Sequence, residues 1–79
     1  MNPTSELVEY LARRLVEHVD QVKVEEVEED GALVIRLHVA PDDLGRVIGR
    51  GGRIARALRT VVRAGGAHGD RRVLLEIVE

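Results

Sequence analysis

Glycine and arginine are concentrated in one short segment, Gly49-Arg50-Gly51-Gly52, with Arg53 directly after it. Glycine permits a positive φ and lets a ligand approach the backbone closely. A helix beginning near Arg53 would direct its unpaired N–H groups and the positive end of its dipole toward this turn. Such a helix start is a ready site for phosphate. The segment therefore predicts an anion site to which Arg50 and Arg53 add positive charge.

Further arginines follow this turn at helical spacing. At about 100° per residue, a helix from Arg53 to Ala64 carries arginines on one face, and its opposing apolar face is expected to pack on a sheet. The first face consists of Arg53, Arg56, Arg59 and Arg63, and the second of Ile54, Ala57, Leu58 and Val61. A merely solvated face would normally mix charges for pairing at i, i+4, but no acid occurs between Leu44 and Gly69. The pattern favours a stripe for an anionic partner.

Charge is distributed unevenly along the chain. The formal net charge is -2, whereas a nucleic-acid-binding domain is usually strongly basic. Residues 1–43 carry eleven acids and four bases, a net of -7, and residues 44–79 carry eight bases and three acids, a net of +5. This asymmetry is more informative than the sum. The net charge therefore does not exclude a nucleic-acid ligand.

Length and composition narrow the function classes. A chain of 79 residues predicts a single domain over residues 1–79 and leaves little room for a deep catalytic cleft. The lack of Cys excludes disulfides, thiolate catalysis and Cys-based zinc sites, and with Tyr10 as the sole aromatic residue a stacking platform for bases is disfavoured. No apolar run reaches the roughly 18 residues of a membrane span, and the N-terminus does not resemble a signal peptide. The expected location is the cytoplasm.

Other chemistry has little support. His18, His38 and His68 lie 20 and 30 residues apart, which is not the spacing of metal ligands. Asp42 and Asp43 suit the positive first turn of a helix better than an acid–base pair, because neighbouring residues on a helix point about 100° apart. We therefore expect no catalytic residue, no metal site, no cofactor and no small-molecule substrate, and the protein is not expected to be an enzyme.

The elements that must position the turn can be assigned from periodicity. A helix capped by Asn2, with Pro3 at its first position, carries an apolar stripe. The members of this stripe are Leu7, Val8, Leu11, Leu15 and Val19. Val22 to Val27 is a predicted strand with a bulge or an early end at Val27, and Leu33 to Val39 is a strand with strict alternation. The acidic turn between them predicts an antiparallel hairpin.

The second half of the chain predicts two helices and a strand. Leu44, Val47 and Ile48 form a short apolar face, the longer helix ends at Gly65-Gly66, and Arg71 to Val78 is the last strand. A strand–helix–helix–strand crossover makes its two strands parallel. The expected fold is α+β in the order α-β-β-α-α-β, with three helices on one face of a three-stranded mixed sheet.

Val47-Ile48-Gly49-Arg50-Gly51-Gly52-Arg53-Ile54 resembles the signature of the KH domain, whose Gly-x-x-Gly tetrapeptide links two helices. The order of elements is similar to the type II arrangement. Leu44 to Arg50, Ala55 to Val62 and Arg72 to Ile77 also resemble the small stand-alone bacterial KH proteins of the KhpA type, so the resemblance covers nearly the whole chain.

The resemblance implies that about four nucleotides of single-stranded RNA are clamped across the Gly-x-x-Gly loop. Bases would lie in an apolar groove between the helix pair and a neighbouring strand edge. The acidic turn Glu28-Glu29-Asp30 would correspond to the variable loop of the family and is expected to point into solvent. The expected RNA-binding residues are Gly49, Arg50, Gly51, Gly52, Arg53, Arg46, Ile48 and Arg56.

The resemblance also implies that the protein acts as a post-transcriptional regulator or RNA chaperone. Its expected partner is a second copy of the chain or a larger KH-containing RNA-binding protein. Two other functions stay open. A protein–protein interaction module would use the KH surface for dimerisation, with Val34, Leu74 and Val78 projecting from an open sheet face. A single-stranded DNA binder would use the same turn, because the sequence identifies no contact to a ribose 2′-hydroxyl.

Overall fold

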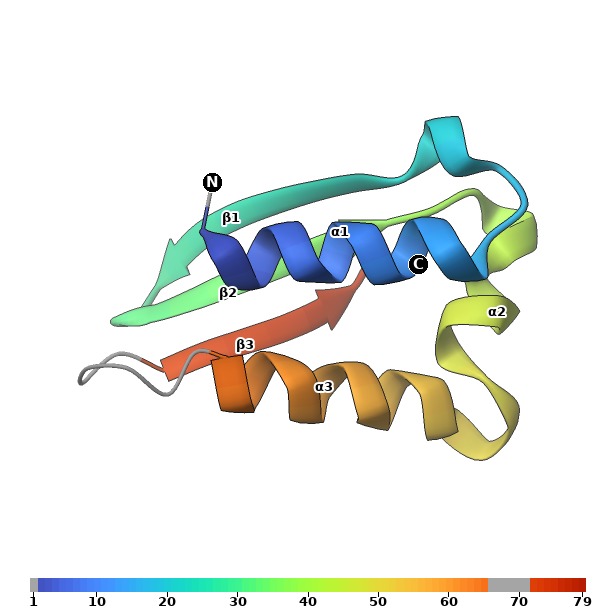
Figure 1. Cartoon of the computed structure of the whole chain (residues 1–79). Helices are drawn as coiled ribbons and strands as arrows, with labels where there is room; N and C mark the ends of the chain where they lie inside the picture. The colour runs from blue at the N-terminus through green and yellow to red at the C-terminus, as the bar shows by residue number, and fades with distance from the viewer. Residues whose placement is uncertain (1, 66–71) are drawn as a thin grey trace.

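The computed structural model describes residues 2–65 and 72–79 and confirms the predicted α+β order (Figure 1). The helices are α1 (Pro3–Leu15), α2 (Leu44–Ile48) and α3 (Arg53–Gly65), and the strands are β1 (Lys23–Glu29), β2 (Ala32–His38) and β3 (Arg72–Ile77). Three 3-10 turns occupy Val19–Gln21, Pro41–Asp43 and Arg50–Gly52. Gly66, His68 and Arg71, which the sequence assigns to a helix end, a loop and a strand start, lie outside the described residues.

The three strands form one mixed sheet in the order β1-β2-β3. β1 and β2 pair antiparallel without interruption, and β2 and β3 pair parallel, as the crossover predicts. Val27 pairs with Val34 inside the unbroken register, so the bulge or early end expected at Val27 does not occur. Because Val27 has the opposite parity to Val24, it lies on the open face of the sheet instead of the helical face.

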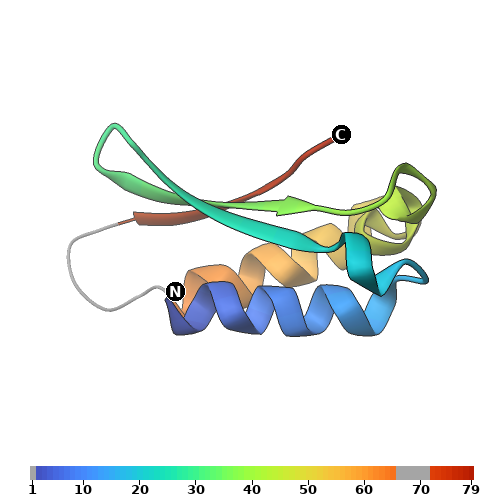
Figure 2. The same cartoon turned by 90° about the horizontal axis from the view of Figure 1, so that it is seen from above.

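The helices lie on one side of the sheet. Figure 2 shows α1 and α3 side by side beneath the strands, with α2 at the end of the sheet where β2 terminates. α1 starts where the sequence predicts, since Asn2 accepts a hydrogen bond from the N–H of Thr4 at 2.7 Å. Its last helical residue is Leu15, because Val16 is extended. Val19 is therefore not part of the helix, contrary to the predicted stripe.

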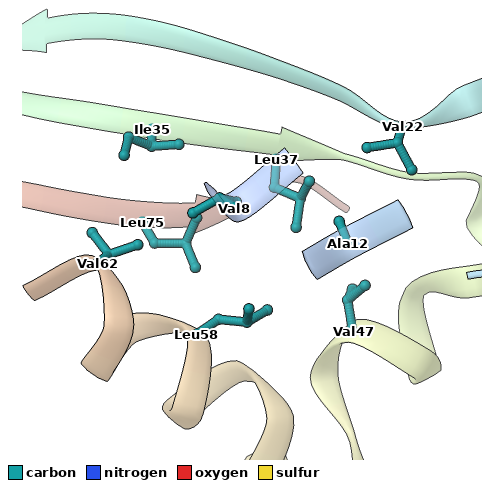
Figure 3. Close-up of a cluster of buried hydrophobic side chains, with 9 residues drawn as sticks. All are labelled: Val8, Ala12, Val22, Ile35, Leu37, Val47, Leu58, Val62 and Leu75. Carbon is teal, nitrogen blue, oxygen red and sulfur yellow. The ribbon is translucent and has the colours of Figure 1, made fainter. Parts of the chain in front are cut away.

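The hydrophobic core lies between the sheet and this helical layer (Figure 3). β2 is the central strand and contributes Ile35 and Leu37, both fully buried. The other members are Val8, Ala12, Val22, Val47, Leu58, Val62 and Leu75. Complete burial of each large side chain is worth about 1.5–3 kcal/mol. From α2, Val47 enters the core. Burial of this side chain holds the short helix, which leads into the glycine turn, against the rest of the fold.

The buried faces of both long helices are rotated from those predicted. In α1 the fully buried hydrophobic residues are Val8 and Ala12, whereas Leu7 is 41% exposed. In α3 the buried residues are Ala55, Leu58 and Val62, and Ala57 is exposed. The reason is that each helix packs on the sheet and on the other helix at once. Part of each apolar stripe is therefore buried in the core, and part of it lines the groove between the helices.

The face of the sheet opposite the helices carries ion pairs around an apolar row. Val27, Val34 and Leu74 lie in register across the three strands. Arg36 pairs with Glu29 and Glu76 at 3.3 Å each, and His38 contacts Glu25. Leu74 is 42% exposed, as its predicted position on the open face requires.

Candidate nucleic-acid interface

The turn between α2 and α3 has the glycine conformation that the sequence predicts. Gly49, Gly51 and Gly52 have φ values of 77°, 63° and 78°. The N–H of Gly49 donates to the carbonyl of Gly45 at 2.9 Å and ends α2. The N–H of Gly52 then donates to the carbonyl of Gly49 at 3.1 Å. α3 therefore begins directly from a 3-10 turn.

This 3-10 turn limits which N–H groups are available to a ligand. The N–H groups of Gly52 and Arg53 donate to Gly49 and Arg50 within the turn. Arg50 and Gly51 contribute no N–H to these bonds, so their N–H groups are the candidates to meet a phosphate. These two candidate residues lie three and two positions before Arg53, where α3 starts and whose own N–H is bonded within the turn.

The first and later glycines of the turn have different surroundings. A Cβ on Gly49 would lie 2.9 Å from the backbone nitrogen of Ile54 and closer still to the Ile54 side chain. At Gly51 and Gly52 a Cβ would meet nothing within 4 Å. Gly49 is therefore required by packing inside the protein, and the backbone at Gly51 and Gly52 is open to approach from outside.

The predicted arginines around the turn are exposed. Arg50, Arg53 and Arg56 project into solvent, and Ile48 is half-buried beside them in sequence. Within residues 2–65 and 72–79, none of these three arginines forms an ion pair. No described carboxylate neutralises their charge, which leaves it available to an anion.

Arg46 is in a different situation from the other predicted arginines. Its Nη2 lies 3.3 Å from Oε1 of Glu17, and its Nε lies 3.4 Å from Oδ1 of Asp43. Glu17 belongs to the connection after α1, so these contacts join the last turn of α2 to the first part of the chain. Arg46 is therefore held by two carboxylates, unlike Arg50 or Arg53.

Asp43 is the centre of this connection. The sequence places Asp42 and Asp43 in the first turn of a helix, but both lie in the 3-10 turn before α2, and the Asp43 side chain does not cap that helix. Its carboxylate is 1% exposed and accepts from the N–H groups of Glu17 and His18 at 3.1 and 3.0 Å. The ring Nδ1 of His18 adds a third contact at 3.0 Å.

These contacts shift the pKa of both partners. The hydrogen bond to Asp43 and then the charge of that carboxylate raise the pKa of His18 above its ordinary value. Burial opposes ionisation of Asp43, but the backbone N–H groups of His18 and Glu17 and the His18 ring together outweigh it. The pKa of Asp43 is therefore lowered. The three contacts to the Asp43 carboxylate tie the start of α2 to the segment that follows α1.

A groove between α3 and β3 continues from the arginine stripe. It has a volume of about 230 Å³. Its lining residues are Arg59, Val62, Arg63, Val73, Leu74 and Leu75. Its lining combines apolar side chains of α3 and β3 with two guanidinium groups and includes no residue of α2, so it is not the groove between the helix pair and a strand edge that the resemblance implies. Arg59 and Arg63 were absent from the predicted site residues, although their place in the arginine stripe was a signal for them.

The acidic hairpin lies away from this surface. Glu28, Glu29 and Asp30 are exposed, as expected, and Figure 1 shows the hairpin at the opposite end of the sheet from the turn between α2 and α3. Among the described residues, no group of three or more acidic or His side chains is arranged to hold a metal ion. No helix in the described ranges is long and apolar enough to cross a membrane.

Comparison with known proteins gives the family. The model of the KhpA/KhpB KH domain matches residues 5–77, a range that contains the turn and the α3–β3 groove. The chain belongs to this family. It is 48% identical to the RNA-binding protein KhpA of Aquifex aeolicus (strain VF5) over 79 residues, which is 100% of both chains. It is 49% identical to the RNA-binding protein KhpA of Halalkalibacterium halodurans over 73 residues, or 92% of this chain and 96% of the relative.

A third KhpA relative, from Clostridium acetobutylicum, is 44% identical over 92% of this chain and 97% of its own. The match to the KhpA/KhpB KH family thus confirms the resemblance drawn from Val47 to Ile54 and its flanks. The eight residues predicted to bind RNA all lie inside the matched range.

Proposed function

We propose that the protein binds about four nucleotides of single-stranded RNA across the turn Gly49–Gly52. The observation that carries this proposal is the open, positive-φ backbone at Gly51 and Gly52, next to Arg50 and Arg53, which form no ion pair with any described residue. The relatives in the KhpA/KhpB KH family are named RNA-binding proteins, which supports the same ligand.

In this proposal phosphates and bases have separate sites. The N–H groups of Arg50 and Gly51 donate to phosphate oxygens, and the guanidinium groups of Arg50, Arg53 and Arg56 add charge-assisted hydrogen bonds. Ile48 and the apolar wall of the α3–β3 groove receive bases, while Arg59 and Arg63 follow the backbone along α3. Aliphatic side chains take the place of the aromatic platforms that the sequence lacks.

Binding of this kind is weak, salt-dependent and only slightly selective for sequence. Phosphate contacts dominate it, so affinity falls as salt displaces the protein from the polyanion. These properties suit a cytoplasmic RNA chaperone or post-transcriptional regulator, which is a binding protein and not an enzyme. A second binding site on a partner raises the effective affinity without new contacts to each strand.

A second copy of the chain is the partner we propose, with a larger KH-containing protein as the alternative. An apolar groove of about 240 Å³ lies between α1 and α3, and Leu7 and Tyr10 are 41% and 60% exposed on α1. Glu6 and Arg14 lie on either side of Tyr10 along α1. An antiparallel α1–α1 contact about Tyr10 would therefore pair Glu6 of each copy with Arg14 of the other. This groove, more apolar than the open sheet face, supports the interaction-module function as well.

The test combines two substitutions in the turn with a matched control. Arg50→Asp with Gly51→Asp places like charge at the phosphate site, and Asp tolerates the αL conformation of Gly51. Arg13→Asp with Gly31→Asp makes the same exchange at an α1 arginine and at a hairpin glycine with φ 79°. Short-RNA binding is measured by fluorescence anisotropy, with circular dichroism for the fold and light scattering for the mass.

We expect the turn variant to lose RNA binding with its fold and mass unchanged, and the control variant to bind as the wild type does. Undiminished binding by the turn variant would exclude the turn as the site. Parallel titrations with RNA and DNA of the same sequence separate the two nucleic acids, since a DNA binder would hold both equally.

A further inference from the structure

Arg46 lies in the last turn of α2, three residues before Gly49. Residues three apart are neighbours on a helix surface, so Arg46 is next to the entrance of the glycine turn. Unlike the other arginines near the turn, it lies against carboxylates, Glu17 on one side and Asp43 on the other. An RNA phosphate at the turn would have to compete with these carboxylates for the Arg46 guanidinium.

Of the two carboxylates, Glu17 depends more on Arg46. Asp43 is buried and already accepts from two backbone N–H groups and the His18 ring, so its charge is compensated without Arg46. The side chain of Glu17 is 68% exposed, and among the described residues it forms an ion pair with Arg46 alone. The Arg46–Glu17 pair is consequently a surface ion pair that can exchange for another anion.

We propose that Glu17 sets the RNA affinity of the turn by occupying Arg46 when RNA is absent. The inference rests on the proposed function, because it requires a phosphate at the turn. Glu17 acts as an internal substitute for phosphate: RNA binding breaks the Glu17 contact, and Arg46 moves to the phosphate while Asp43 keeps its other donors. Glu17 is thus an affinity-determining residue that touches no RNA itself.

The same region supplies a control for general electrostatics. Asp42 is exposed, adjoins Asp43 in the chain and is close enough to act on the charge of His18. It is not a partner of Arg46. Asp42→Asn therefore removes the same charge as Glu17→Gln from the same neighbourhood without releasing the arginine.

The experiment measures the Kd for a short single-stranded RNA at fixed pH and salt. The proteins are the wild type, Glu17→Gln, Asp42→Asn, Arg46→Gln and the double variant Glu17→Gln with Arg46→Gln. We expect Glu17→Gln to tighten binding roughly two- to fivefold, the range that exposed ion pairs permit. Asp42→Asn should change the Kd by clearly less, and Glu17→Gln should have no effect once Arg46 is Gln.

Three results would overturn the proposal: equal tightening by Glu17→Gln and Asp42→Asn, tightening that persists without Arg46, or weaker binding by Glu17→Gln. The last would mean that Glu17 positions Arg46 for RNA. Failure of the proposed function is distinct, since the wild type would then bind no RNA, or the Arg50→Asp, Gly51→Asp variant would bind normally.

Discussion

Gly49 packs so closely against Ile54 across the turn that a Cβ on Gly49 would lie 2.9 Å from the Ile54 backbone nitrogen. The contact joins the end of α2 to the first turn of α3, and the two helices therefore meet at a fixed angle. Of the three positive-φ glycines in the turn, Gly49 is the one whose missing side chain permits a close internal contact. The other two leave their backbone open to a ligand.

The two kinds of glycine should respond differently to alanine. Gly51→Ala adds a Cβ in open space and carries only the strain of a positive φ, about 1–2 kcal/mol. Gly49→Ala adds a clash with Ile54 to the same strain and should be more destabilising by about a further 1–3 kcal/mol. Urea unfolding followed by circular dichroism measures both. Equal losses of stability would show that the turn relaxes around the new methyl group.

The arginines of the α3–β3 groove should carry part of the salt dependence of RNA binding. Arg59→Gln and Arg63→Gln each remove one phosphate contact, so each should lower the slope of log Kd against log salt by about 0.7 for a single strand. Arg36→Gln, on the open face of the sheet, is the control and should leave the slope unchanged. An unaltered slope in both groove variants would place the RNA elsewhere.

How far the sequence predicts this site depends on the range of the interactions. The glycine conformation and the exposed arginines follow from local patterns of residue type and spacing, and the parallel pairing of β2 with β3 follows from a general rule for crossover connections. The partners of Asp43 do not, because Glu17 and His18 are 26 and 25 residues away in sequence. A helix-start Asp and a buried Asp that caps another segment have the same local sequence.

The faces of the helices show the same limit. Periodicity identifies an apolar side of α1 and α3 but cannot tell the sheet-facing part from the part that lines the inter-helix groove. Periodicity therefore places Leu7 and Ala57 in the buried stripes, whereas the structure exposes both and buries Ala12 and Ala55. Which apolar residues reach the core depends on how each helix is rotated against the sheet and the other helix, and this rotation is not contained in the spacing of the residues.

The His18–Asp43 pair predicts a loss of stability at alkaline pH. The pKa of His18 is raised in the folded protein, so its contribution is complete below the ordinary histidine value near 6.5. It is lost as pH rises through the folded pKa. Urea unfolding between pH 5.5 and 8.5 should show this decline in the wild type and not in His18→Gln. His38→Gln keeps the pair and should retain the decline, and an identical profile in all three would rule out the pair as its source.

Asp43 predicts a separate loss of stability in acid. Its pKa is lowered in the folded state, so its contribution is present above the ordinary aspartate value and disappears as pH falls through the folded pKa. Asp43→Asn keeps the shape but not the charge, and should flatten the wild-type stability profile below pH 4. Asp42→Asn is the matched variant, and a similar flattening there would assign the effect to general charge.

The proposed two-fold contact on α1 makes a charge-swap prediction. Glu6→Arg and Arg14→Glu should each weaken self-association, because each places like charges opposite one another across the antiparallel helices. The double variant restores opposite charges and should recover the dimer. Sedimentation velocity measures the mass, and Asp20→Arg, an exposed position outside α1, is the control. Failure of the double variant to recover would exclude this arrangement of the copies.

Negative and positive charge are separated between β1 and α3. β1 carries Glu25, Glu26, Glu28 and Glu29, α3 carries Arg53, Arg56, Arg59 and Arg63, and the two elements lie at opposite edges of the fold (Figure 1). A molecule with separated charges is an electric dipole, and the field of an approaching polyanion exerts a torque on it. On the proposed function, this torque turns the arginine edge toward an RNA before contact, so that productive encounters are a larger fraction of collisions than random orientation would give.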